Sequence, residues 1–351
     1  MLSKRACACG PLDKRESLMV DLNGLRGTSQ AASARRTSVN ESLTHVKNVG
    51  VVWRELRPLH WVKNVFVLAP LVFARRVTDV HACLLAAAAF GGFCLLSSAV
   101  YIINDVVDAE QDRRHRLKRM RPVAAGQIPA ADAFFIAFIC CAIGLTACAL
   151  VRWPVAIAGV CYVALTLLYT FGLRRWMVVD VMCIALGFVL RAAAGGLALS
   201  VPVSPWLLAC TFTLCMFLGF TKRRYELREV EESEPGEQAP AGRPPYDAPL
   251  LEQFLSISAG AAIVCYILYA MDARTVHNLG TPALLFLTPL VVYCVFRLLH
   301  LVRAGKFSDP TDAITRDAPF LIALALWIVG AVLIATWGQG FAGGAGHLVR
   351  R

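Results

Sequence analysis

Long uncharged apolar runs dominate the chain after its first fifty residues. Residues 82–103, 153–173, 253–271 and 275–296 contain no Asp, Glu, Lys or Arg. Each run reaches the roughly 18 to 20 residues that a helix needs to cross a bilayer. The pattern predicts an all-α polytopic membrane protein, whose helices are bundled around a polar cavity that faces the cytoplasm. Nine spans are expected, at residues 56–76, 81–103, 131–151, 153–172, 179–199, 205–221, 253–271, 281–302 and 318–337.

The two ends of the chain differ from this pattern. Residues 1–50 are rich in Ser, Arg and Ala and have no periodic apolar positions, which predicts a disordered cytoplasmic tail. They also lack the apolar core of a signal peptide. We therefore expect a transmembrane domain over residues 51–340 and a short external tail over 341–351.

Composition agrees with a membrane protein. The chain has 351 residues, of which 57% are apolar and 17% are charged. A soluble domain carries roughly 25% charged residues, so a soluble globular protein is excluded. Most of the thirteen cysteines lie inside apolar segments, where Cys behaves as a small hydrophobic residue, and they predict neither disulfides nor a zinc site.

Basic residues are distributed unevenly between the two sides of the membrane. The loops after the second, fourth, sixth and eighth expected spans carry most of the Lys and Arg. Because Lys and Arg in short loops stay on the cytoplasmic side, we expect these loops and the N-terminus in the cytoplasm and the C-terminus outside the inner cell membrane. Topology thus explains the net charge of +11, and no nucleic-acid partner is expected.

The end of the second expected span carries a polar cluster. Asn104, Asp105, Asp108 and Asp112 follow apolar residues in the stretch YIINDVVDAEQD. Spacings of three and four place the three Asp residues on one face of a continuing helix. Clustered carboxylates repel one another, and Mg²⁺ offsets such repulsion by pairing one or two carboxylates with substrate phosphates and water. We predict that Asp105, Asp108 and Asp112 bind Mg²⁺ and that Asn104 lies with them in a catalytic cluster.

Basic residues suited to phosphate follow directly. Lys118, Arg119 and Arg121 lie within seventeen residues of the acids. Arginine presents a fork of donors that matches phosphate oxygens, and lysine acts as a point charge. Metal-binding acids beside phosphate-binding bases are the groups that a diphosphate substrate requires. Topology alone also places basic residues here, and explains part of the run.

Further polar residues fall near the same membrane boundary. A second cluster, expected to bind substrate, contains Tyr169, Arg174 and Asp180, and a further candidate, Arg191, lies about three helical turns farther, inside an apolar span. An arginine within the membrane pairs with a buried carboxylate or with an anionic ligand, and the sequence leaves both open. Further substrate-binding candidates are expected at the same rim, namely Lys63, Asn64, Lys222 and Arg223. The acids Asp309, Asp312 and Asp317 are expected there too.

These motifs resemble a known family. The stretch NDVVDAEQD is similar to the NDxxDxxxD motif of the UbiA-type intramembrane prenyltransferase superfamily, and the resemblance runs from about residue 53 to 337. Within that superfamily, WVKN, YTFGLRRWMVVDV, GFVLRAAAGG and KRRYEL resemble the decaprenyl-phosphate phosphoribosyltransferase branch. The resemblance implies an all-helical fold and a Mg²⁺-dependent transferase.

One departure from the superfamily pattern bears on the donor. Many members carry a second acidic motif, DxxxD, whereas Asp180 is followed here by the apolar stretch VMCI. The absence of this motif favours the phosphoribosyl branch, whose donor is phosphoribosyl pyrophosphate and whose acceptor is a polyprenyl phosphate. The branch implies release of pyrophosphate and a role in making cell-envelope polysaccharide precursors. In that branch, the position of Arg174 is typically Lys.

Two other functions remain open at this point. A prenyltransferase of the same superfamily would move a prenyl group from a prenyl diphosphate to an aromatic or other small acceptor. A transporter would need ionisable groups along a route through the membrane, but here they crowd one side, with Arg191 the main exception. The sequence predicts no oligomeric state.

Overall fold

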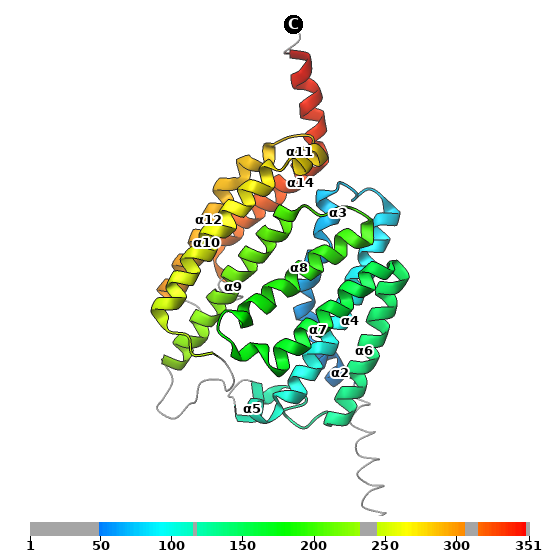
Figure 1. Cartoon of the computed structure of the whole chain (residues 1–351), viewed down its shortest axis with the longest axis vertical. Coiled ribbons are helices and arrows are strands. Elements are labelled where there is room, and N and C mark those ends of the chain that lie inside the picture. The colour runs from blue at the N-terminus through cyan, green and yellow to red at the C-terminus, as the bar shows by residue number, and fades with distance from the viewer. Residues whose placement is uncertain (1–48, 115–117, 232–243, 306–314, 349–351) are drawn as a thin grey trace, which may run out of the picture.

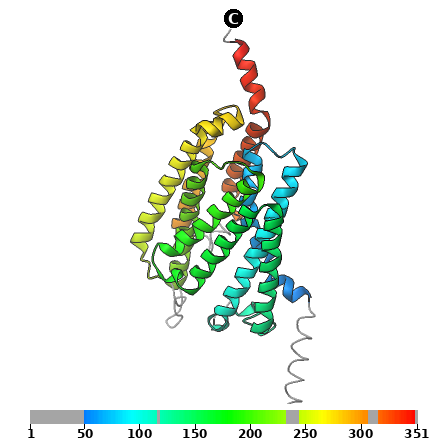
Figure 2. The same cartoon turned by 45° about the vertical axis from the view of Figure 1, so that its right-hand side comes forward.

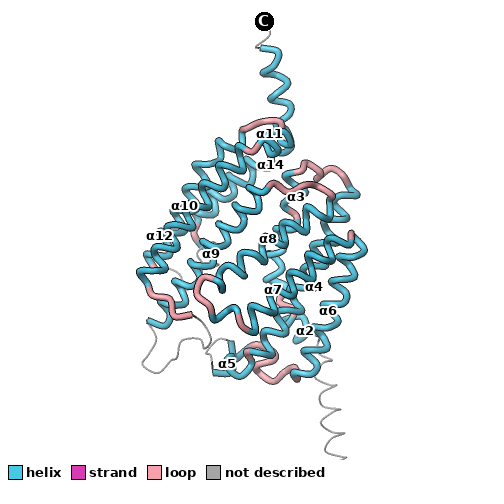
Figure 3. Tube along the Cα trace, in the orientation of Figure 1, coloured by secondary structure: helices cyan, strands magenta, loops and turns pink. Residues whose placement is uncertain are grey.

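A computed structural model describes residues 49–114, 118–231, 244–305 and 315–348. Within these residues every regular element is helical (Figure 3). The first elements are α2 (Val49–Glu55), η1 (Pro58–Val67), α3 (Ala69–Phe73), α4 (Val80–Val107), α5 (Ala109–Arg114), η2 (Lys118–Met120), α6 (Ala130–Val151), α7 (Trp153–Phe171) and η3 (Leu173–Arg175). The others are α8 (Val179–Leu199), α9 (Pro205–Glu231), α10 (Ala248–Met271), α11 (Ala273–Leu279), η4 (Ala283–Leu287), α12 (Thr288–Ala304) and α14 (Ala318–Leu348).

Eight helical segments in the described residues are long and apolar enough to cross a membrane, and they match eight of the nine predicted spans. The protein is therefore an integral multi-pass membrane protein. The first expected span, residues 56–76, instead forms η1 and α3, a shorter apolar segment over Pro58–Phe73. Pro70 lacks a backbone N–H and cannot continue the helical hydrogen bonding of η1, so a new helix begins there.

The long helices run roughly along the longest axis of the molecule (Figures 1 and 2). Neighbouring pairs include α4 with α6, α7 with α8, and α9 with α10. The connections alternate between two ends. One end holds α2, α5 and the connection from α7 to α8, and the other holds α11 (Figure 1). At that second end α14 projects beyond the bundle to Leu348, into the segment predicted as an external tail.

Apolar side chains form two main cores. Phe93 and Leu96 of α4 pack with residues of α7 and α8 in one of them. Phe217 of α9 and Leu251 of α10 pack with α12 in the other. Since α8 contacts both α7 and α9, it joins the two halves and brings their polar ends to one side of the bundle.

Gly195 permits a very close approach between α8 and η1. A Cβ atom at this position would lie 2.0 Å from the carbonyl oxygen of Val67 and 3.1 Å from a ring carbon of Pro70. Small residues at such crossings allow helices in a membrane to pack backbone against backbone. This contact holds the short first segment against the bundle.

Substitution of Gly195 by alanine is expected to lower stability, because the new methyl group would collide with backbone atoms. Overpacking of this kind costs about 1 to 3 kcal/mol, and thermal unfolding in detergent should show a lower midpoint. Gly260→Ala on α10 is the matched control, since a Cβ atom there meets nothing within 4 Å. Equal midpoints for the two variants would contradict the assigned contact.

Candidate functional site

The polar end of α4 forms the centre of the site. The predicted continuous helix is interrupted, because α4 ends at Val107 and α5 begins at Ala109. Two backbone hydrogen bonds nevertheless continue across the break, from Asp108 N–H to Asn104 O at 2.9 Å and from Asp112 N–H to Asp108 O at 2.8 Å. Asp105 and Asp112 are buried, whereas Asp108 is half-buried. The three acids therefore stay close together at one end of the bundle.

Arginines from three segments neutralise these acids. Arg57 pairs with Asp105 at 2.5 Å. Arg121 bridges two acids, at 3.0 Å from Asp105 and 2.5 Å from Asp112. The third arginine, Arg174, donates to both oxygens of Asp108, at 2.8 and 3.0 Å. The sequence predicted that Arg121 and Arg174 lie near the acids, and the structure brings both into direct contact with them.

Glu55 adds a fourth acid that the sequence did not predict. Its side chain is 1% exposed, and neither carboxylate oxygen has a hydrogen-bond partner among the described residues. Burial and the nearby charge of Asp105 raise the pKa of Glu55 to about 7, although Arg57 and Arg121 act against this rise. This carboxyl group is therefore short of positive charge in the free site.

The donor groups at this end suit a hard divalent cation. Within the described residues, no three His, Cys, Asp or Glu side chains converge to hold a metal by themselves. Mg²⁺ does not need such a set, because it is held by one or two carboxylates together with substrate phosphates and water. The orphaned oxygens of Glu55 beside Asp105 fit that requirement.

Local backbone geometry explains how Glu55 and Arg57 reach α4. Arg57 has left-handed backbone angles, with φ 54° and ψ 58°, and this turn separates α2 from η1. Ser98 of α4 donates to Leu56 O at 2.7 Å and accepts from Trp61 Nε1 at 3.0 Å. Ser98 precedes Asp105 by seven residues, which places both on one helical face. The turn is thereby fixed beside the acids.

Basic residues from several parts of the sequence lie close enough to His60 to affect its pKa. His60 lies in η1, which is not among the eight spanning helices. Burial and then the charges of Lys63, Arg57, Lys222 and Arg121 lower the pKa of His60 to about 4. The fold thus gathers basic residues from η1, α9 and the segment after α5 on the same side of the acids.

The remaining basic residues of the first predicted run lie nearer the surface. Lys118 and Arg119 belong to η2, just before Arg121. Arg119 is exposed and Lys118 is half-buried. Arg121 of the same run pairs directly with Asp105 and Asp112.

A second network surrounds Asp180 at the start of α8. Asp180 is fully buried and accepts from Arg223 Nε at 2.6 Å and from the Tyr246 hydroxyl at 2.6 Å. Arg223 also donates to the Tyr169 hydroxyl at 3.3 Å and to Glu226 at 2.6 Å. Both oxygens of Asp180 are thus engaged within the protein. The structure brings Tyr169, Asp180 and Arg223 together, as the sequence predicted, but in a network of their own.

The end of α7 links the two networks. Thr170 donates to the side chain of Asn104, while its neighbour Tyr169 accepts from Arg223. Three residues farther, η3 begins and carries Arg174 to Asp108. A displacement of this helix end would therefore alter contacts in both acidic centres, the one around Asp105 and Asp108 and the one around Asp180.

The connection from η3 to α8 contains a strained residue. Val178 has φ 68° and ψ −44°, and Val179 N–H donates to Met177 O at 2.8 Å, which makes a rare form of γ-turn. A β-branched side chain is unfavourable at positive φ. Tyr246 holds the turn, because its hydroxyl accepts from Val178 N–H at 2.7 Å while it donates to Asp180.

Arg191 lies deeper in the bundle and is 4% exposed. Its guanidinium also lies over the rings of Tyr162 and Phe188, at 4.5 and 5.1 Å from the centroids. A carboxylate is not among its partners in the described part of the chain, so neutral dipoles and ring faces stabilise this charge. The guanidinium donates to Asn64 Oδ1 at 2.6 Å, Tyr162 OH at 2.8 Å, Gly187 O at 2.9 Å and Ser97 Oγ at 3.4 Å.

Asn64 belongs to this deeper network and not to the rim where the sequence placed it. Its side chain is fully buried. Ser97 donates to it at 3.1 Å and precedes Asp105 by eight residues along α4. At a rise of 1.5 Å per residue, the network lies about 12 Å farther into the bundle than Asp105. Asn64 and Arg191 are therefore separated from the acids by about two helical turns.

The last predicted acidic segment, residues 305–319, does not join the centre through any contact that the structure describes. Asp317 pairs with Arg297 at 2.8 Å and caps α14 by accepting from Phe320 N–H at 2.9 Å. Asp309 and Asp312 lie outside the described residues.

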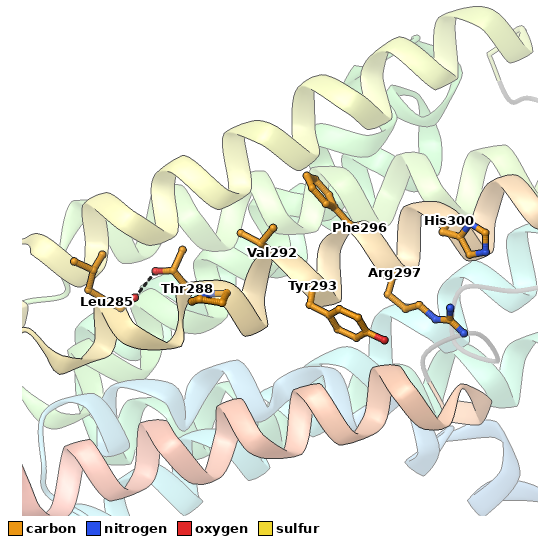
Figure 4. A pocket seen from close by; sticks show the side chains of 8 residues that line it. Leu285, Thr288, Val292, Tyr293, Phe296, Arg297 and His300 are labelled. Carbon is orange, nitrogen blue, oxygen red and sulfur yellow. Dashed lines mark hydrogen bonds between the residues drawn. The ribbon is translucent and has the colours of Figure 1, made fainter.

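A groove of about 780 Å³ follows η4 and α12 (Figure 4). Its walls are mainly apolar, as expected for a surface that faces lipid, and Arg297 and His300 lie at one end of it. None of the acids or arginines described above lines this groove, except Arg297, whose partner is Asp317.

Sequence reasoning missed three residues of the two acidic centres, namely Glu55, Arg57 and Tyr246. Glu55 and Arg57 lie just before a proline and about fifty residues before the acidic motif, so their spacing does not group them with it. Tyr246 lies 66 residues after Asp180 and follows a Pro/Gly-rich loop. Only Arg57 carried a signal, since it begins the stretch RPLHWVKN, from which Lys63 and Asn64 were predicted.

Comparison with known sequences gives a consistent family match. Residues 65–314 match the model of the UbiA prenyltransferase family. The chain is 33% identical over 290 residues to the decaprenyl-phosphate phosphoribosyltransferase of Mycobacterium tuberculosis, which covers 81% of this chain and 94% of that relative. It is also 33% identical over 287 residues to the uncharacterized protein y4nM of Sinorhizobium fredii. That match covers 81% of this chain but 54% of the relative, so the chain spans about half of the length of y4nM.

Comparison with solved structures confirms the predicted all-helical fold. A UbiA homolog from Archaeoglobus fulgidus, solved with GPP and Mg²⁺ bound, superposes with a TM-score of 0.61. The superposition covers 81% of this chain and 98% of the homolog, at 17% sequence identity. At this identity the likeness concerns the fold alone.

The raised pKa of Glu55 predicts a pH dependence of stability. In the metal-free protein the folded state keeps the Glu55 proton up to about pH 7, whereas the unfolded chain loses it near its ordinary value of 4.5. The contribution of Glu55 is therefore complete below about pH 4.5 and is lost as the pH rises through 7. Thermal unfolding in detergent with a chelator should show Glu55→Gln more stable than the parent above pH 7 and equal to it near pH 4.5. A constant difference across this range would contradict the assignment.

Removal of the Tyr246 hydroxyl should loosen the turn at Val178. Tyr246→Phe deletes one donor to Asp180 and one acceptor for Val178 N–H, and a buried group left unpaired costs about 1 to 3 kcal/mol. We expect a lower thermal midpoint. Tyr293→Phe on α12, whose side chain is 44% exposed, is the control and should leave the midpoint unchanged. If both variants melt together, the Tyr246 hydroxyl does not hold the turn.

Proposed function

The chain belongs to the UbiA prenyltransferase family, as its motifs predicted, and is therefore a membrane-embedded transferase. On this premise we propose that it transfers the 5-phosphoribosyl group from phosphoribosyl pyrophosphate to a polyprenyl phosphate, such as decaprenyl phosphate, and releases pyrophosphate. The observation that carries this proposal is the engagement of Asp180 by Arg223 and Tyr246. Because Asp180 is engaged within the protein, only the acids of α4 and α5 are left to bind substrate among the described residues of these two networks, whereas the resemblance implies two acidic motifs for a prenyl-diphosphate site.

Several observations support this substrate assignment. Relatives at 33% identity over most of their length bear the name decaprenyl-phosphate phosphoribosyltransferase. The donor carries a diphosphate and a separate 5-phosphate, so it needs more positive charge than a prenyl diphosphate. Arg57, Arg121 and Arg174 at the acids, with Lys63 and Lys222 around His60, supply charge for two separate phosphate groups.

The arginines would act by exchanging partners. In the free site each one neutralises a carboxylate. When the donor enters, each phosphate group offers a pair of acceptor oxygens that a guanidinium can bind bidentately, as it binds a carboxylate. Arg57, Arg121 and Arg174 would then bind the diphosphate, while Lys63 and Lys222 would hold the 5-phosphate or the phosphate of the lipid.

Asp105, Asp108 and Asp112 would hold Mg²⁺, which when bound would supply positive charge to the departing pyrophosphate. The arginines would share this task once they have turned from the carboxylates to the donor, because their charges would then lie beside the bond that breaks. Asn104, held by Thr170, would orient the donor next to the acids.

The proposed transfer is a substitution at carbon 1 of the ribose. The bond from carbon 1 to the pyrophosphate oxygen breaks, and pyrophosphate leaves with the bonding electrons. A phosphate oxygen of the polyprenyl phosphate forms the new bond to carbon 1. The attacking phosphate is already ionised near neutral pH, so the reaction needs no general base, and none of the residues described here has to take a proton.

We place the acidic centre on the cytoplasmic side of the inner membrane. The basic loops and the described N-terminal segment share its end of the bundle, whereas the end of α14 lies at the other (Figure 1). Basic short loops stay in the cytoplasm. This orientation gives the water-soluble donor access to the site, while the lipid acceptor arrives within the bilayer. We also propose a role in making cell-envelope polysaccharide precursors, as the resemblance to the phosphoribosyltransferase branch implies.

The proposal predicts a specific requirement for both substrates. Purified protein in detergent with Mg²⁺ should release pyrophosphate from phosphoribosyl pyrophosphate only when a polyprenyl phosphate is present. Mass spectrometry should find the lipid heavier by one phosphoribosyl group. Asp108→Asn should lower the rate by at least about a hundredfold, the scale of losing one charge-stabilising group, and it should preserve the fold because Asp108 is only half-buried.

The control for this variant is Glu110→Gln in the same segment, whose parent side chain is 82% exposed and pairs with Arg114 alone. It should keep full activity. No phosphoribosyl lipid with wild-type protein would overturn the proposal. Transfer of a labelled prenyl group from a prenyl diphosphate to an aromatic acceptor would replace it with the other activity of the superfamily.

A further inference from the structure

Glu55 is the last residue of α2 and lies outside every motif that the sequence presents. Its carboxyl group is 1% exposed, and both of its oxygens lack a hydrogen-bond partner within the described residues. An ionised carboxylate buried in this way is strongly unfavourable unless it is paired. No cation of the described residues is hydrogen-bonded to this carboxyl group.

The nearby cations of the protein are committed to other acids. Arg57 contacts both oxygens of Asp105, and Arg121 bridges Asp105 and Asp112. Their charges reach Glu55 without a hydrogen bond to it. Glu55 and Asp105 are thus neighbouring carboxyl groups, and the oxygens of Glu55 receive no hydrogen bond from these arginines.

We infer that Glu55 and Asp105 together form a two-carboxylate site for a divalent cation, in which Glu55 is a metal-binding residue outside the acidic motif. Oxygen ligands and two negative charges match Mg²⁺, which completes its octahedral shell with water and phosphate oxygens. The phosphate in this site is the diphosphate of the donor, a point that rests on the proposed function. The cation supplies the charge that Glu55 lacks.

A metal ion bound by Glu55 and Asp105 would also link α2 to α4. Glu55 comes from α2 and Asp105 from α4, and the turn between α2 and η1 is already fixed to α4 through Ser98. A cation held by both acids neutralises Asp105, so that Arg57 is free to turn to the phosphate. The same event thus loads the metal and releases an arginine for the donor.

The test measures metal binding directly and needs no turnover. Mn²⁺ replaces Mg²⁺ and reports its own binding by electron paramagnetic resonance of the full-length protein in detergent, with inorganic pyrophosphate present as the probe. Glu55→Gln should weaken Mn²⁺ binding by at least about tenfold, the lower end of losses seen for groups that support a metal site. Glu55→Asp should restore part of the affinity, since it returns the charge on a shorter side chain.

Two controls make the outcome decisive. Glu110→Gln removes an exposed acid from the neighbouring segment and should leave Mn²⁺ affinity unchanged. Thermal unfolding without metal tests whether Glu55→Gln is folded, and this variant is expected to melt no lower than the parent at pH 8. Mn²⁺ binding equal to that of the parent, or no binding by the parent itself, would overturn the inference. Mn²⁺ binding that depends on Glu55 without any phosphoribosyl product would instead support the metal site and overturn the proposed function.

Discussion

Neutralisation of the buried carboxylates at the end of α4 is the constraint on which the surrounding segments depend. Asp105 is almost fully buried, and a lone charge there would be costly. Its partners come from 48 residues earlier and 16 residues later in the chain, and the partner of Asp108 comes from 66 residues later. The turn after α2, the loop before α6 and the start of η3 are thus held against one helix end by the same electrostatic demand.

A buried charge deeper in the bundle, that of Arg191, is stabilised in a different way. Near the boundary, charges meet opposite charges. Around Arg191, by contrast, amide, hydroxyl and carbonyl dipoles share one positive charge, and two aromatic rings cover it. The groups that accept hydrogen bonds from Arg191 belong to η1, α4, α7 and α8, so this arginine joins four segments without a carboxylate partner in the described part of the chain.

The sequence allowed the fold to be predicted better than the site, for physical reasons. Apolar length alone identifies a spanning helix, and eight of the nine predicted spans are present in the structure. The first expected span is shorter in the structure and is divided near Pro70. A hydropathy pattern does not register the loss of one backbone N–H. Partner choice was harder. Asp180 and Arg223 were both selected as candidate ligands of substrate, yet each satisfies the other, which depends on how α8 and α9 pack. Glu55 could not be predicted for the same reason, since its proposed role depends entirely on its burial beside Asp105.

The order of residues along the chain has a consequence for assembly in the membrane. Arg57 precedes Asp105, and Arg121 follows it in the same helical hairpin, so Asp105 meets its counter-charges soon after it is synthesised. Asp180 waits much longer, because Arg223 comes 43 residues later and Tyr246 comes 66 residues later, before the next spanning helix. Since chains fold from the N-terminus as they are made, the first half can settle while α8 still carries an uncompensated acid. The second half of the bundle can therefore be completed only when α9 and the start of α10 have been made. In a chain that stops before this step, Asp180 at the start of α8 lacks both of these partners.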